Sequence, residues 1–241
     1  MLSTEQLGDV IGSQREIFEK KNQGTEREID FERQLKTKQI TAITGIRRCG
    51  KSTLLKQFAL RLEKYYYVNL DDERLAGFEV TDFARMMDVF ASLFPAKNLL
   101  VDEIQNVPQW ERFIRRLFDE GFKIFLTGSN SHLLKSELST HLTGRYFPVE
   151  LYPFSFSEYL KATKKAIDYP LKSNIKILHY FDRYLSEGGF PEFVLSRDSE
   201  HLQRIYEDVL YKDILTKYKI REVKAFKQLA VYLYSNIGKE T

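Results

Sequence analysis

The sequence predicts an α/β fold, with a parallel five-stranded sheet that carries helices on both faces and a helical, lid-like segment after it. Short apolar runs alternate with helix-period stretches between residues 39 and 151, which is typical of sheets built from strand–helix–strand units. A loop with two glycines joins the first apolar run to the first helical stretch. From about residue 157 onward, only helical patterns follow.

The predicted strands are short and rich in apolar or β-branched residues, and they cover residues 39–44, 65–70, 98–101, 123–128 and 145–151. Helical spacing of apolar residues predicts helices at 51–64 and 82–94. Pro108 opens a further helix, which Gly121 ends. Strands separated by helices are expected to run parallel, because parallel neighbours need a long crossover between them.

Three helical stretches, 174–189, 201–219 and 223–238, make up most of the remaining chain. Gly188, Gly189 and Pro191 separate the first stretch from the second. We therefore expect a core at residues 1–160 and a helical segment at residues 161–241. The letters KET follow the last stretch, which is typical of a chain cut where another element begins, so we expect a fragment.

Composition limits the class of protein. The 241-residue chain has a net charge of +3, which does not favour nucleic acid or an anionic membrane as a bulk partner. Cys49 is the single cysteine, so an internal disulfide is excluded. No apolar run reaches the ~20 residues that a membrane helix needs, and the N-terminus lacks a signal-peptide core. These features predict a cytoplasmic protein with no membrane partner.

Residues 45–53 read GIRRCGKST, which matches the phosphate-binding loop known as Walker A. Glycines let backbone N–H groups approach a phosphate closely, and the following helix points its positive dipole end at the same phosphate. The competing interpretation is a tight turn before an ordinary helix; the strand–loop–helix context favours the phosphate loop. The residues predicted to bind the nucleotide are Gly45, Arg47, Arg48, Cys49, Gly50, Lys51, Ser52 and Thr53.

Within this loop, Lys51 is expected to reach the β- and γ-phosphates, as a catalytic residue, and Ser52 to ligate Mg²⁺. Arg47 and Arg48 either add positive charge near the nucleotide or face solvent. Cys49 is expected to fill space in the loop while its backbone N–H contacts a phosphate.

An acidic pair, Asp102 and Glu103, ends the third predicted strand and is typical of Walker B. A magnesium–nucleotide site needs a carboxylate to hold the metal shell, and Asp102 fits that role. A hydrolase also needs a group that orients or deprotonates the attacking water, and Glu103 fits it. Acidic residues often end strands, so the pair indicates a nucleotide site only because a phosphate loop precedes it in the chain.

Two further polar residues are catalytic candidates. Asn130 follows the fourth strand, where it either holds the attacking water or caps a short helix. Arg145 precedes the fifth strand, where it either stabilises transition-state charge, in its own subunit or a neighbour's, or lies on the surface. No Asn- or Thr-Lys-x-Asp tetrapeptide of guanine-specific sites follows a strand, so ATP is the expected nucleotide.

The segments TAITGIRRCGKSTLLKQF, NLLVDEIQNVPQWERFIRRLFDEG and LYPFSFSEYL resemble a prokaryotic family of AAA-type P-loop ATPases with a C-terminal domain of unknown function. The resemblance implies that the fourth strand lies between the first and the third, that Glu103 is the base for water attack, and that a helical segment packs on the nucleotide side. It also implies that residues 161–241 begin a C-terminal winged-helix-like region.

The leading functional hypothesis is Mg²⁺-dependent ATP hydrolysis that couples nucleotide state to a C-terminal effector region, with a homo-oligomer or a protein partner as further possibilities. One alternative is a P-loop kinase of a small molecule, against which Glu103 counts. Another is a nucleotide-gated DNA-binding module, against which the near-neutral charge counts.

Overall fold

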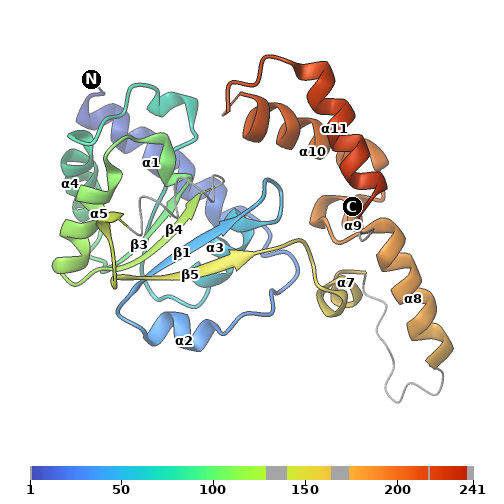
Figure 1. The fold of residues 1–241 in the computed structure, drawn as a ribbon. Coiled ribbons are helices and arrows are strands. Elements are labelled where there is room, and N and C mark those ends of the chain that lie inside the picture. The colour runs from blue at the N-terminus through green and yellow to red at the C-terminus, as the bar shows by residue number, and fades with distance from the viewer. Residues whose placement is uncertain (1, 129–139, 164–173, 217, 238–241) are drawn as a thin grey trace. The chain divides into compact units, whose positions relative to one another are not determined.

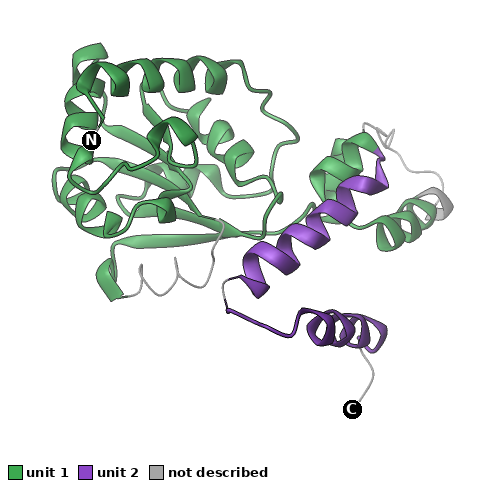
Figure 2. Ribbon diagram, turned by 90° about the horizontal axis from the view of Figure 1, so that it is seen from above, with its two compact units in different colours: residues 1–196 green, residues 197–241 purple. Residues whose placement is uncertain are grey.

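A computed structural model describes residues 2–128, 140–163, 174–216 and 218–237, and the structural statements below concern these residues. The chain forms two compact units, residues 1–196 and 197–241, which Figure 2 shows in green and purple. The sheet lies entirely in the first unit. The division predicted between a core at residues 1–160 and a helical segment at residues 161–241 falls inside the first unit, and it stays a prediction.

The first unit contains the predicted five-stranded sheet, in which all neighbouring strands are parallel (Figure 1). Its order is β2-β3-β4-β1-β5, so β4 lies between β1 and β3 as the family resemblance implies. The carboxyl ends of parallel strands share one edge of the sheet. That edge therefore receives both the loop after β1 and the acidic pair after β3. The strands are β1 (Ile40–Gly45), β2 (Tyr66–Asn69), β3 (Asn98–Asp102), β4 (Lys123–Gly128) and β5 (Tyr146–Leu151).

Helices cover both faces of the sheet, because successive strand residues point to opposite sides. Ala42 packs into the core beneath α1, α4 and α5, whereas Ile43 packs into the core beneath α3. Leu99 and Leu100 alternate in the same way. The helices of this part are α1 (Thr4–Lys20), α2 (Phe31–Lys36), α3 (Lys51–Ala59), α4 (Asp82–Leu93) and α5 (Trp110–Asp119), with 3-10 turns η1 (Glu73–Leu75) and η2 (Ile104–Asn106).

Helix α1 is an element that the sequence patterns above do not predict. Ser3 and Gln6 form a capping box at its start, and its buried side chains recur at helical spacing. The buried Gln14 links α1 to β2, since its side chain hydrogen-bonds both the N–H and the carbonyl of Asn69 at 2.9 Å. The capping box and the spacing are local signals from which α1 is predictable.

After the sheet, the described residues of the first unit form the helices α7 (Phe156–Ala162), α8 (Asn174–Glu187) and α9 (Pro191–Ser196). They share a small core formed by Phe154, Tyr159 and Val194. The N–H of Phe154 donates to the carbonyl of Gly189 at 2.7 Å, which ties the start of this helical group to the turn before α9.

The second unit is helical and contains α10 (Ser199–Asp208), the π-helical turn η3 (Val209–Leu215) and α11 (Val223–Ser235). The helix predicted at 201–219 is therefore interrupted by a widened turn. An apolar cavity of about 250 Å³ lies between these elements, lined by residues such as Leu210, Phe226 and Leu233. Among the described residues, no helix is both long and apolar enough to span a membrane.

Candidate functional site

The loop after β1 has the conformation that its glycines predict. Gly50 directly precedes α3 and adopts a left-handed conformation with φ of 98°, which a residue with a Cβ rarely takes. Arg48 also has positive φ, at 60°. Left-handed residues in a short loop turn successive backbone N–H groups towards one side, which makes a concave anion site.

Gly45, at the end of β1, is required for another reason. A Cβ at this position would lie 2.2 Å from the carbonyl oxygen of Leu151 and 2.8 Å from the Cys49 sulfur. The loop therefore packs directly against the end of β5, and only a residue without a side chain fits there.

We predict that Gly45→Ala destabilises the fold by about 1–3 kcal/mol, because the clash is with backbone that cannot move aside cheaply. Urea unfolding followed by circular dichroism measures the change. The matched control is Gly12→Ala, at an exposed position in α1 with nothing within 4 Å of the added carbon. This control is expected to stabilise the protein by about 0.5–1 kcal/mol. Equal stability of Gly45→Ala and wild type would contradict the packing argument.

Lys51 is the first residue of α3, and its side chain is only 5% exposed. Its ammonium group donates hydrogen bonds to the carbonyls of Gly45 and Ile46, both at 3.1 Å. The side chain thus curls back over the loop instead of extending into solvent. An ammonium held there is placed to meet an anion that binds to the loop N–H groups.

Asp102 ends β3 beside this loop, and it is buried. The hydroxyl of Thr127, from the end of β4, donates to one carboxylate oxygen, and Ser52 of α3 lies close enough to the same carboxyl group to lower its pKa. Burial raises the pKa of the Asp102 carboxyl, whereas these two hydroxyl contacts lower it. The charge of Lys21 lowers this pKa less than the hydroxyl contacts do, and no ion pair between Asp102 and a basic side chain is found in the described part of the chain.

Glu103 directly follows β3 in a left-handed conformation, with φ of 55°. Its backbone N–H donates to the Thr127 hydroxyl at 3.0 Å, so one threonine holds both members of the acidic pair. The Glu103 carboxylate accepts a hydrogen bond from Gln105 at 2.6 Å. The backbone turn and these contacts fix the carboxylate at the same edge of the sheet as the loop.

The other loop residues have distinct surroundings. Arg48 forms an ion pair with Glu192 of α9 at 2.7 Å, which joins the loop to the helical group. Arg47 is half-buried, and Thr53 lies in the first turn of α3. Cys49 is fully buried, and burial raises the pKa of its thiol. The side chain of Cys49 thus packs inside the loop, and a contact of its backbone N–H with a phosphate stays a prediction.

Arg145 is not brought to the loop within this chain. It precedes β5, and its carbonyl accepts a hydrogen bond from Ile40, at the amino end of β1. Its guanidinium lies 3.7 Å from the carboxylate of Asp119. Because the loop is at the other end of β1, five residues away, the separation is roughly 17 Å. A role in a neighbouring subunit stays a prediction. Asn130 lies outside the described residues.

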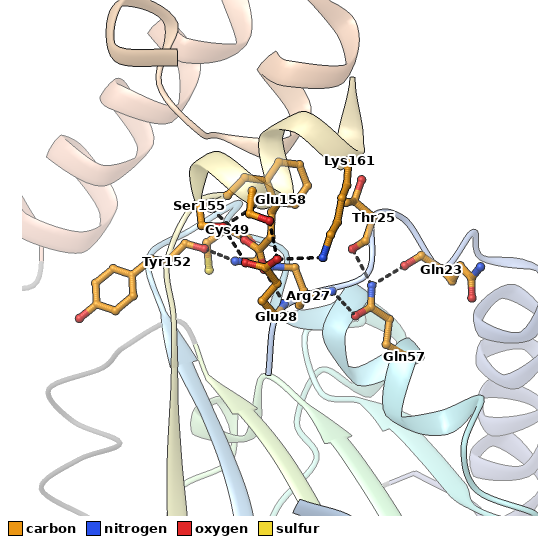
Figure 3. A network of polar contacts seen from close by, with 12 residues as sticks. Gln23, Thr25, Arg27, Glu28, Cys49, Gln57, Tyr152, Ser155, Glu158 and Lys161 are labelled. Atoms are coloured by element: carbon orange, nitrogen blue, oxygen red, sulfur yellow. Dashed lines mark hydrogen bonds and ion pairs between the residues drawn. The ribbon is translucent and has the colours of Figure 1, made fainter. Parts of the chain in front are cut away.

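Sequence reasoning misses Arg27, which is almost completely buried beside the loop (Figure 3). It also assigns no role to Glu158, the ion-pair partner of Arg27, and attaches none to the hydroxyl of Thr127. The position of Thr127 at a strand end is a usable signal. Arg27 and Glu158 lie 131 residues apart, so no local pattern relates them.

These features define the class of protein. The sheet is parallel, with β4 between β1 and β3. A phosphate loop joins β1 to α3, and an acidic pair follows β3. This arrangement is the fold of P-loop nucleoside triphosphatases. The family model described as "AAA domain" matches residues 37–160, which is more than half of the chain. The chain belongs to this AAA family, as the quoted segments indicate.

Relatives match most of this chain. The uncharacterized protein MJ1544 of Methanocaldococcus jannaschii is 34% identical over 218 residues, which cover 86% of this chain and 49% of the relative. An uncharacterized protein of Haemophilus influenzae is 30% identical over 214 residues, which cover 83% of this chain and 52% of the relative. The chain thus spans about half the length of these two relatives.

Solved structures with a similar fold include AMPPCP-bound DnaA from Aquifex aeolicus, with a TM-score of 0.46 and 14% identity over 87% of this chain and 77% of that chain. A RuvB variant of Thermotoga maritima has a TM-score of 0.44 and 19% identity over 75% of this chain and 56% of that chain.

Proposed function

We propose that the chain binds Mg²⁺ and ATP at the loop after β1 and hydrolyses the nucleotide. The observation that carries this proposal is the position of the acidic pair. Asp102 lies close to Ser52, at the start of the loop helix, and Glu103 lies next to Asp102 on the same edge of the sheet. A phosphate held by the loop would therefore be close to a metal-binding carboxylate and to a base.

Each loop residue has a defined part in this proposal. The backbone N–H groups from Gly45 to Thr53 surround the phosphates, and the N-terminus of α3 adds its positive dipole end. Lys51 leaves the carbonyls of Gly45 and Ile46 to pair with the β- and γ-phosphates. Arg47 and Arg48 add positive charge at the loop.

The residues present fit a magnesium ion. Ser52 and Asp102 supply the hard oxygen ligands that Mg²⁺ prefers. A carboxylate as buried as Asp102 normally has a cationic partner, because desolvation penalises its charge. The hydrogen bond that the Asp102 carboxylate accepts comes from the neutral hydroxyl of Thr127, so a metal ion would supply the positive charge that this contact lacks. When bound, the ion would neutralise charge on the phosphate oxygens.

Glu103 acts as the base that orients and deprotonates the attacking water. Asn130 is proposed to hold that water, and Arg145 to act on the site of a neighbouring subunit. The Arg48–Glu192 ion pair gives the loop a direct connection to α9. Through such contacts, nucleotide state would be coupled to the helical elements and to an effector region or a protein partner.

Phosphate release from ATP tests the proposal. We expect the wild-type chain to release phosphate with Mg²⁺ present and to lose this activity in EDTA. Asp102→Asn is expected to lower the rate at least about tenfold, and extra Mg²⁺ should partly restore it, because the variant weakens the metal site. Asp88→Asn, an exposed position in α4, is the matched control and should behave like wild type.

Equal rates for Asp102→Asn and wild type at every Mg²⁺ concentration would contradict the metal role. Transfer of phosphate to an added acceptor, with none released to water, would favour a kinase instead. Failure of wild type to bind ATP by equilibrium titration would overturn the proposed function.

A further inference from the structure

Arg27 is the buried charge that the proposed chemistry leaves unused. It lies between α1 and α2, and its side chain is 6% exposed. The guanidinium donates to Glu158 Oε1 at 2.9 Å, to the carbonyl of Cys49 at 2.8 Å and to the carbonyl of Tyr152 at 2.6 Å. Figure 3 shows these contacts converging on one side chain. They join the phosphate loop, the end of β5 and helix α7.

The backbone of Arg27 is held as firmly as its side chain. Its N–H donates to Gln57 Oε1 at 3.1 Å, and the amide of Gln57 donates to the carbonyls of Gln23 and Thr25 at 2.8 Å. Gln57 belongs to α3, the helix that begins at the loop. The segment that carries Arg27 is therefore fixed to the same helix whose start would bind phosphate.

The contact with the Cys49 carbonyl sets the direction of one loop amide. The peptide group between Cys49 and Gly50 is planar and trans, so its C=O and N–H point in opposite directions. Arg27 holds the oxygen on its own side, which directs the Gly50 N–H away from Arg27. If this peptide group turned over, a carbonyl oxygen would face the phosphate in place of an N–H donor.

Gly50 makes such a turnover easy, because a glycine adopts several backbone conformations at similar energy. A guanidinium presents its donors in a rigid planar fork, so it restrains the peptide more tightly than a single flexible ammonium can. A buried ion pair contributes little to stability by itself. The Arg27–Glu158 pair is therefore better explained by the geometry that it imposes on the loop.

We propose that Arg27 is a positioning residue of the phosphate loop. Arg27 binds the Cys49 carbonyl and thereby orients the Gly50 N–H to donate to the nucleotide phosphates. Glu158 fixes the guanidinium for this task, since it also accepts a hydrogen bond from the N–H of Glu28 at 2.7 Å. The proposal rests on the proposed function and deepens it. It assigns a role in nucleotide binding to a residue outside the loop motif.

Arg27→Lys tests the proposal, because lysine keeps a positive charge beside Glu158 but cannot reach all three acceptors. We expect its affinities for ADP and for ATP to fall roughly tenfold, while the melting temperature without nucleotide changes little. Arg61→Lys is the matched control. Arg61 contacts Gln57 and Glu26 in the same region but does not touch the loop, so this variant should bind like wild type.

A second measurement needs no nucleotide. Hydrogen exchange of a peptide covering residues 45–52 should be faster in Arg27→Lys, whereas peptides from β3 and β4 should be unchanged. A purely structural role would accelerate exchange throughout the core. If Arg27→Lys does not fold, the double variant Arg27→Met with Glu158→Gln removes both charges and takes its place.

The outcomes separate the two proposals. Wild-type affinity together with wild-type loop exchange in Arg27→Lys would overturn the positioning role and leave the proposed function standing. Failure of the wild-type chain to bind ADP or ATP would overturn the proposed function. Weaker binding with faster exchange confined to the loop supports both.

Discussion

Replacing Lys51 by alanine is expected to weaken ATP and ADP binding at least about a hundredfold, which corresponds to about 2.7 kcal/mol. The reason is the position of its ammonium group, which lies 3.1 Å from the carbonyls of Gly45 and Ile46 at the loop itself. From there, it needs only to exchange these carbonyls for phosphate oxygens. Equilibrium titration with a fluorescent ATP analogue measures the loss.

Lys64→Ala is the control for this experiment, because Lys64 is an exposed lysine outside the loop and its removal changes the net charge equally. It should bind nucleotide like wild type. Thermal unfolding of both variants without nucleotide checks that the fold is intact. Similar affinities for Lys51→Ala and wild type would mean that the loop does not bind phosphate through this lysine.

Glu103→Gln is expected to bind ATP with nearly wild-type affinity and to hydrolyse it about 10²–10⁴-fold more slowly. Glutamine preserves the size of the side chain but cannot accept a proton from water. The backbone anchor, from the Glu103 N–H to the Thr127 hydroxyl at 3.0 Å, is unaffected by the change. Single-turnover hydrolysis, measured with enzyme in excess over ATP, reports the chemical step directly.

Glu73→Gln is the matched control, since Glu73 is exposed in η1 and remote in sequence from the acidic pair. It should hydrolyse ATP at the wild-type rate. An unchanged rate for Glu103→Gln would remove Glu103 from the role of base. Weakened binding with an unchanged rate of hydrolysis would instead assign Glu103 to nucleotide binding.

Much of the first unit is predictable because its signals are local. All five strands are present near the predicted residues. The loop that joins β1 to α3 lies at the position predicted from its two glycines and its lysine. The parallel arrangement follows from strands that alternate with helices. Apolar periodicity and the conformational freedom of glycine act over a few residues, so they can be recognised without knowing the fold.

The candidate site is only partly predictable. The proximity of Asp102 to Ser52 depends on strand order, which the family resemblance implies and which apolar periodicity does not reveal. Arg145 shows the limit most clearly. Its sequence context fits a site arginine and a surface arginine equally well, but β5 runs parallel to β1, so the start of β5 lies at the edge away from the loop.

The sequence alone determined the class of this protein, because a phosphate loop in a strand–loop–helix context and the segments that resemble the AAA family are contiguous stretches. Only the tertiary structure decided which distant side chains contact that loop and the acidic pair. Thr127 joins both acids of the pair, and Arg27 reaches Cys49, Tyr152 and Glu158 across up to 131 residues of chain. Such contacts form only when the strands assemble into the sheet and bring separate segments together at its carboxyl edge. Their geometry therefore exists only in the folded chain.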